Sequence, residues 1–188
     1  AELGVAQDTT APKKAESSKI KPYNEVITSK AVTKSGLFNV HTVGEKYYFE
    51  IPDDLLSREF LFTTRLSKVA TGSPMFGGEL MNGMIVSFEK AAGDKLFVRA
   101  VTSVAVCDTA DALSLAVKNA TIDPIIMVLD VKARGKDNKS SVVDFTDFYL
   151  KENLISGFGA EAKKVMRTGS PAADRSFILS MNAFPQNI

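Results

Sequence analysis

The stretch Gly36–Leu66, GLFNVHTVGEKYYFEIPDDLLSREFLFTTRL, decides the fold. Apolar and polar residues alternate along it twice, over Lys46–Ile51 and again over Glu59–Leu66. A period of two is the pattern of a β-strand that buries one face. Gly44 suits the positive φ of a tight turn between Leu37–Val43 and Lys46–Ile51, which predicts a hairpin. The stretch therefore predicts three β-strands laid against one another.

Further strands are predicted downstream of this stretch. Met84–Glu89 and Lys95–Thr102 flank a Gly-Asp pair typical of a hairpin turn. Pro124–Ala133 begins as a nearly continuous apolar run, which predicts a strand buried on both faces. Ser141–Phe145 follows a polar turn and completes another hairpin. The run of hairpins indicates an antiparallel meander.

Two segments change to helical spacing. Thr109–Asn119 gathers its apolar residues on one helical face. Asp147–Ile155 reads as a second short helix, for which Asp144 or Thr146 supplies the cap. The predicted fold class is α+β, mainly β, with antiparallel meander sheets of about seven to eight strands and two short covering helices.

The chain of 188 residues divides into three parts by composition. Residues 1–19 are polar and unpatterned, which predicts a disordered tail. Residues 20–70 form a small N-terminal β module, and residues 71–188 a β-rich second module packed with the first. Phe184–Ile188 looks like the start of another strand, so the second module is expected to be truncated. A start at Ala1 is what signal-peptide cleavage leaves, although an artificial start looks the same.

Charge and hydropathy argue against nucleic-acid binding and against a membrane-spanning helix. Lys and Arg number 23 against 22 Asp and Glu, a formal net charge of +1. No bulk field therefore draws the protein towards nucleic acid. No apolar run approaches the roughly 18 residues that a membrane-spanning helix needs. We expect no nucleic-acid partner and no membrane-spanning segment.

The residues that usually carry chemistry are scarce. The chain has one histidine, His41, and one cysteine, Cys107, too few for a conventional zinc site. Alternation puts His41 on a strand face as a structural or surface imidazole, and Cys107 has no basic neighbour, which predicts a buried thiol. A nucleophilic pair of these two residues is the remote alternative. The expectation is no catalytic, no cofactor-binding and no metal residue.

Three further features suggest sites but have simpler explanations. The glycine-rich loop Thr71–Gly83 lacks the spacing of a phosphate loop, which favours a connector over a binding loop. The carboxylate pairs Asp53 with Asp54 and Asp144 with Asp147 lie where aspartate ends strands and caps helices. The third feature is the two arginines within strands, Arg65 and Arg99. We expect them to share a carboxylate partner such as Glu50 or Glu89.

Ordered motifs over Lys21–Ile188 resemble a family of secreted bacterial proteins, widespread in Bacteroidetes, that are described as zinc-dependent metallopeptidases of the metzincin type. The early motifs are KPY, GLFNVH, KYYFEIPD and REFLF, and the later ones are AVKN, PII, VVDFTDFY, RSFI and AFPQNI. The family's two leading domains have no assigned function. Its His-Glu-x-x-His helix lies downstream, so no catalytic or zinc-binding residue carries over to this chain.

The resemblance implies a function for the chain as part of a larger protein. It implies a non-catalytic N-terminal module that packs on or orients the downstream catalytic domain of the same polypeptide, or helps to bind polypeptide substrate. Zinc is expected only in that downstream domain, and the location is secreted or periplasmic, after signal-peptide removal. The alternative is a free-standing cell-surface module that binds a glycan or protein through Thr71–Gly83 and the strand holding Tyr47 and Tyr48.

Overall fold

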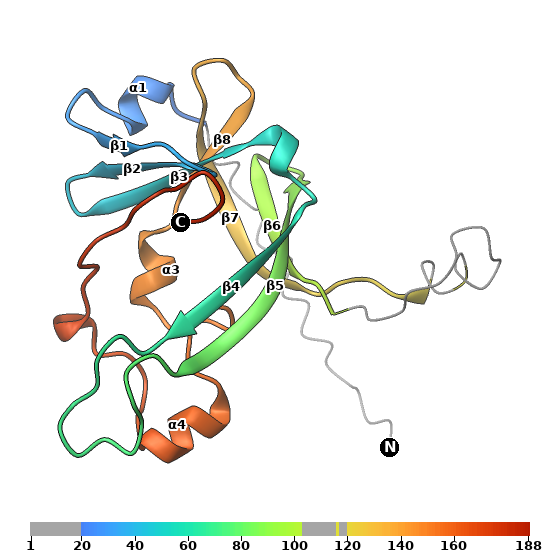
Figure 1. Ribbon diagram of the computed structural model, residues 1–188. Coiled ribbons are helices and arrows are strands. Elements are labelled where there is room, and N and C mark those ends of the chain that lie inside the picture. Colours follow the sequence, from blue (N-terminus) through green and yellow to red (C-terminus); the bar gives the residue numbers. More distant parts are fainter. Residues whose placement is uncertain (1–19, 103–115, 117–119) are drawn as a thin grey trace, which may run out of the picture.

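The computed structural model describes residues 20–102, 116 and 120–188 (Figure 1). The predicted tail 1–19, Cys107 and nearly all of the predicted helix Thr109–Asn119 lie outside the described residues. None of the helices within the described part is long and apolar enough to cross a membrane.

The described residues form one curled, eight-stranded antiparallel sheet, which confirms the predicted fold class. The strand order is β1-β2-β3-β8-β7-β6-β5-β4. The strands are β1 Val32–Lys34, β2 Asn39–Val43, β3 Lys46–Pro52, β4 Glu59–Arg65, β5 Leu80–Ala91, β6 Lys95–Ala100, β7 Ile125–Arg134 and β8 Ser140–Asp144.

Two meanders meet in this sheet at the β3–β8 pair. β1, β2 and β3 form one meander, and β4 to β8 form the other. The expectation that β4 lies beside β3 is wrong, because β8 takes that place, with Phe49 opposite Val143. β4 lies instead at the far edge and pairs only with β5. Strands from both predicted modules thus share one sheet, while the module division at residue 70 stays a prediction.

The core fills the inside of the curl. Phe49 and Phe145 stack with ring centroids 4.2 Å apart. Phe38 lies against Phe49 and also contacts Phe60 of β4, at a centroid distance of 5.4 Å. The curl therefore brings the β4 edge back towards the segment that precedes β2, as the ribbon shows (Figure 1). Aromatic contacts across the curl stabilise it more than the buried area alone.

A smaller cluster covers the outer face next to α1, the helix Tyr23–Val26. Val26, Tyr48 and Val142 belong to it. Val143 of β8 faces the inner core and Val142 the outer cluster, so β8 is buried on both faces, as is β3 through Phe49 and Tyr48. β7 alternates between buried and partly exposed residues along its second half, so the prediction that it is buried on both faces is wrong.

The predicted second helix is present but shorter than expected. α3 spans Thr146–Leu150. Its N-cap residue is Phe145, so the prediction that Asp144 or Thr146 caps the helix is wrong. Asp144 Oδ1 instead accepts a hydrogen bond from the Thr146 main-chain N–H at 3.0 Å, in the turn that leads into the helix. The chain then turns at Asn153, whose Oδ1 accepts from the N–H groups of Ile155 and Ser156. This side chain competes with the helical pattern, which explains the early end. A further helix, α4 Ala160–Met166, follows.

Two other boundaries differ from the sequence prediction. The sequence predicts a loop over Leu80–Gly83, but these residues begin β5 and pair with β4. The C-terminal residues form no new strand among the described residues, only a short 3-10 turn at Ala173–Arg175 and one isolated bridge between Phe184 and Asn187. The C-terminal segment lies beside Leu37, whose N–H donates to Phe184 O at 2.6 Å.

Candidate functional site

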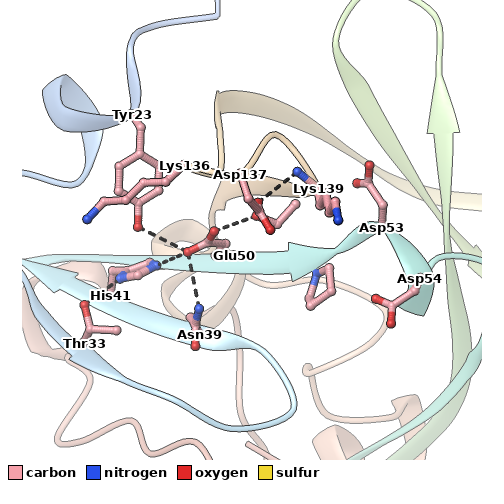
Figure 2. Close-up of a pocket in the computed structure, with 12 residues that line it drawn as sticks. Tyr23, Thr33, Asn39, His41, Glu50, Asp53, Asp54, Lys136, Asp137 and Lys139 are labelled. Carbon is pink, nitrogen blue, oxygen red and sulfur yellow. Dashed lines mark hydrogen bonds and ion pairs between the residues drawn. The ribbon is translucent and has the colours of Figure 1, made fainter.

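A polar cavity of 790 Å³ opens where α1, the strands β1 to β3 and the β7–β8 turn meet (Figure 2). Its centre is Glu50 of β3, which shares the outer strand face with Tyr48 because side chains alternate along a strand. The lining residues are Tyr23, Thr33, Asn39, His41, Glu50, Pro52, Asp53, Asp54, Lys136, Asp137, Lys139 and Ser140.

Glu50 is 9% exposed, and its carboxylate accepts hydrogen bonds from four side chains. Oε2 accepts from His41 Nε2 at 2.9 Å, from Tyr23 Oη at 3.2 Å and, more weakly, from Asn39 Nδ2 at 3.5 Å. Oε1 accepts from Ser140 Oγ at 2.6 Å. Four donors satisfy a buried charge that would otherwise be costly, so the carboxylate holds α1, β2, β3 and β8 together.

These contacts alter the acidity of two groups. The hydrogen bond from His41, helped by those from Ser140 and Asn39, lowers the pKa of Glu50 to about 2 despite its burial. Burial raises the pKa of Tyr23 to about 12, and the neighbouring Glu50 carboxylate adds to that rise. Glu50 is therefore ionised and Tyr23 is a neutral donor at neutral pH.

His41 links this carboxylate to the edge of the sheet. Because an ionised carboxylate only accepts, His41 Nε2 carries a proton. Nδ1 lies 2.8 Å from the hydroxyl of Thr33 on β1. A hydroxyl, an imidazole and a carboxylate in line are the parts of a nucleophilic triad. Here the ring is only 2% exposed and both its nitrogens are engaged, so the line ties three strands together and leaves no ring nitrogen for a ligand.

Gly135 makes room for the cluster at the start of the β7–β8 turn. A Cβ at this position would overlap both Ser140 Oγ and Glu50 Oε1. The Gly135 N–H also donates to Ser140 O at 3.0 Å, which closes the turn. Only glycine therefore lets the turn approach the carboxylate this closely.

The carboxylates on the cavity rim are engaged separately rather than as a metal site. Arg134 donates two parallel hydrogen bonds to Asp53, from Nη1 to Oδ1 at 3.1 Å and from Nη2 to Oδ2 at 2.6 Å. The Arg134 contact lowers the pKa of Asp53, and Lys90 adds to the effect. Within the described residues, no three His, Cys, Asp or Glu side chains gather as metal ligands would. The donor set does not fit zinc.

The other carboxylate pair that the sequence singles out is also divided between separate roles. Asp144 accepts from the Thr146 N–H in the turn before α3 and lies 3.4 Å from Lys46 Nζ, while Asp147 pairs with Lys151 one helical turn later. Of the two strand arginines, Arg99 pairs with Glu89 as expected. The expectation for the other arginine is wrong, because Arg65 Nη1 donates to Gly78 O at 3.0 Å.

The sequence missed the cluster around Glu50 because its donors are far apart in the chain. His41 and Glu50 are nine residues apart, and the hairpin register through Gly44 puts Asn39 directly opposite Glu50. That register was a usable signal. The other two donors, Tyr23 and Ser140, belong to α1 and β8, and no local sequence pattern predicts that they contact Glu50.

The proposed aromatic binding strand is only partly accessible. Tyr48 is buried and belongs to the outer cluster, while Tyr47 is half-buried. The loop before β5 is mostly exposed, and its last part, Leu80–Gly83, is strand rather than loop. A binding surface made of these two elements is therefore smaller than the sequence suggests.

Comparison with known proteins gives two family matches. Residues 20–69 match a family described as Domain of unknown function (DUF5118), and residues 78–188 match one described as Domain of unknown function (DUF5117). No curated protein and no solved structure matches the chain.

Proposed function

The chain belongs to the DUF5117 family, whose model covers residues 78–188, and from there we propose that it is a non-catalytic interaction module of a larger exported bacterial zinc-dependent metallopeptidase. The module packs on or orients a catalytic domain that follows it in the same polypeptide, or helps to hold the polypeptide substrate. It acts outside the cytoplasm, in the periplasm or beyond, and zinc belongs to the catalytic domain.

The observation that carries the proposal is a run of exposed apolar side chains towards the C-terminus. Phe177, Leu179 and Phe184 project from the segment after α4, and Leu179 is 87% exposed. Large apolar side chains that gather on a surface mark contacts with another protein surface. An adjoining domain would cover these side chains, while other residues of the same segment hold it to the sheet, through Lys34 Nζ to Met181 O and Leu37 N–H to Phe184 O.

The single histidine supports a non-catalytic role. Both ring nitrogens of His41 are engaged within the Glu50 cluster, and the carboxylates around it are held by arginine, lysine or hydroxyl partners. A catalyst of peptide hydrolysis needs a base or a metal-bound water free to reach the substrate. These side chains instead hold the sheet together.

The second candidate is a free-standing cell-surface or periplasmic module that binds a glycan or protein. The polar cavity favours it, because Asn39, Asp137 and Lys136 line an opening on which hydroxyl groups of a sugar would find donors and acceptors. Binding of soluble oligosaccharides that Asp137→Ala abolishes would support this candidate. Asp174→Ala is the matched control, because Asp174 is an exposed carboxylate that does not line the cavity.

Two measurements on the purified chain test the first proposal. We expect no hydrolysis of casein and less than stoichiometric zinc by atomic absorption after dialysis against zinc. One zinc bound per chain, or hydrolysis that metal chelators stop, overturns the proposal. The reading frame is also expected to encode a His-Glu-x-x-His segment after Ile188, and a frame without one favours the free-standing module.

The contact surface is tested in the longer polypeptide. Leu179→Ser is expected to lower the melting temperature of the whole protein, because it weakens the contact between the domains. Ile122→Ser is the matched control, since Ile122 is similarly exposed, at 79%, but lies away from the C-terminal segment. Equal effects of the two substitutions would contradict the proposed surface.

A further inference from the structure

The edge strand β4 presents main-chain groups that no described residue pairs. β4 is seven residues long and pairs with β5 alone. The other edge strand, β1, has only three residues and ends in Lys34. Natural sheets protect their edges with short strands and charges. The central residues of β4, from Phe60 to Thr64, carry no charge at all.

The register shows which β4 groups point away from the sheet. The Ile85 carbonyl accepts from Val101 N–H, so the main chain of Ile85 faces β6. The Phe88 carbonyl accepts from Ser57 N–H, so the main chain of Phe88 faces the β4 side. Antiparallel strands alternate in this way from residue to residue. Even-numbered residues of β5 therefore bond to β4.

The register between β4 and β5 then determines which main-chain groups of β4 have no partner on β5. Phe60 lies opposite Val86 and Phe62 opposite Met84, so these residues use their main-chain groups on β5. The N–H and C=O groups of Glu59, Leu61 and Thr63 point to the open side. Within the part of the chain that the structure describes, no hydrogen bond is recorded for them.

A groove runs along this open side. Its volume is 930 Å³, and residues from Arg58 to Thr64 form one wall. The far wall is the C-terminal segment, Pro185–Ile188, together with Leu37. Phe38, Phe49 and Tyr149 also line the groove and give it an aromatic side facing the core. The seven residues of β4 span roughly 20 Å, enough for several residues of a second strand.

This combination fits one kind of occupant. A row of alternating donors and acceptors beside an aromatic floor is complementary to an extended polypeptide, whose main chain pairs with the edge and whose alternate side chains enter the groove. The side chains of Phe60 and Phe62 are half-buried towards the core, while Leu61 is 70% exposed on the other face. A bound strand would thus place apolar residues at every second position against the aromatic floor.

We propose that the β4 groove binds an extended polypeptide segment by adding it to the sheet as a ninth strand next to Glu59–Arg65. This inference rests on the polypeptide-engaging part of the proposed function and identifies where that polypeptide lies. It assigns recognition to the outward main-chain groups of Leu61 and Thr63, with selection for alternating apolar residues.

The probe is an array of short synthetic peptides that carry valine, isoleucine or phenylalanine at alternate positions. Members are expected to bind, and the amides of Leu61 and Thr63 to exchange quickly with solvent in the free protein and slowly in the complex. N-methylation of the alternate peptide amides that face β4 is expected to weaken binding roughly tenfold or more, since each blocks a main-chain hydrogen bond. Methylation of the intervening amides leaves binding unchanged.

A protein variant gives the complementary test. Thr63→Pro removes the outward N–H but no bond to β5, so it is expected to abolish binding while the fold persists. Thr63→Ala keeps the N–H and is the matched control. Should Thr63→Pro fail to fold, the N-methylated peptides test the same bonds from the other partner.

Three outcomes overturn the inference. They are an array without any binding member, binding that N-methylation weakens equally at all positions, and binding without protection of Leu61 and Thr63. None of these outcomes changes the result expected from the zinc and hydrolysis measurements, which test the proposed function separately. Conversely, a chain that binds zinc and hydrolyses protein would overturn the non-catalytic role while leaving peptide binding at β4 in place.

Discussion

Nε2 of His41 lies 2.9 Å from Oε2 of Glu50, and both side chains are buried beneath α1. This hydrogen bond joins neighbouring strands, β2 and β3, while Ser140 Oγ donates to the other oxygen of the carboxylate from β8. The Glu50 carboxylate therefore bonds side chains from both meanders at the place where they meet. Removing a single partner from such a cluster leaves the remaining groups buried without compensation.

Glu50→Gln is expected to lower the free energy of unfolding at pH 7 by about 3 kcal/mol, because it leaves His41 without its carboxylate. The folded pKa of Glu50, about 2, lies below the ordinary value of 4.5. Its contribution is therefore present above pH 4.5 and is lost as the pH falls towards 2. Urea unfolding at several pH values should show the difference between wild type and variant shrinking over that range.

Asp54→Asn is the control for this prediction, because Asp54 is an exposed carboxylate on the same cavity rim. It is expected to change the stability by less than about 0.5 kcal/mol. A difference between wild type and Glu50→Gln that stays constant from pH 7 to pH 2 would show that the charge of Glu50 does not stabilise the fold.

Gly135→Ala is expected to destabilise the protein by about 1–3 kcal/mol, because the added methyl group overlaps Ser140 Oγ and Glu50 Oε1. Gly169→Ala is the matched control, since its Cβ would meet no atom within 4 Å. Chemical denaturation of the two variants measures the difference. Equal stability of both would mean that the β7–β8 turn moves away from Glu50 without cost.

Gly36→Ala is expected to release the C-terminal segment from the sheet. Its Cβ would overlap main-chain atoms of Phe184 and Ala183, which cannot yield as a flexible side chain does. Trypsin should then cleave after Arg175 faster than in the wild type. Gly83→Ala is the control, because its Cβ would make only ordinary contacts, 3.9 Å from Phe62 O. Unchanged cleavage would show that the segment is held elsewhere.

Strand positions were predictable because alternation is local. β2, β3, β6 and β8 agree with the sequence to within two residues at each end. Pairing depended on the connections. Gly44 makes a tight turn, and its hairpin is present, whereas the segment from Pro52 to Arg58 carries the chain to the far edge. Alternation in β4 gives no information about which strand it pairs with.

The start of β5 was missed for a different reason. Asn82 and Gly83 are poor strand formers and mimic a loop. Tertiary contacts override this tendency, because Asn82 Nδ2 donates to the carbonyls of Leu154, Ile155 and Gly157. Those carbonyls belong to a segment more than seventy residues away, which no local pattern reveals. The donors to Glu50 were hidden by the same kind of distance.

The β3–β8 pairing also sets an order of events during synthesis. β3 emerges from the ribosome early, but its neighbour is completed only at Asp144. Until then the first hairpin has an unpaired edge and Glu50 lacks the hydrogen bond from Ser140. Contacts of such long sequence separation form slowly. Over that interval chaperones would have to shield the open edge of β3, and the completion of β8 would end that need.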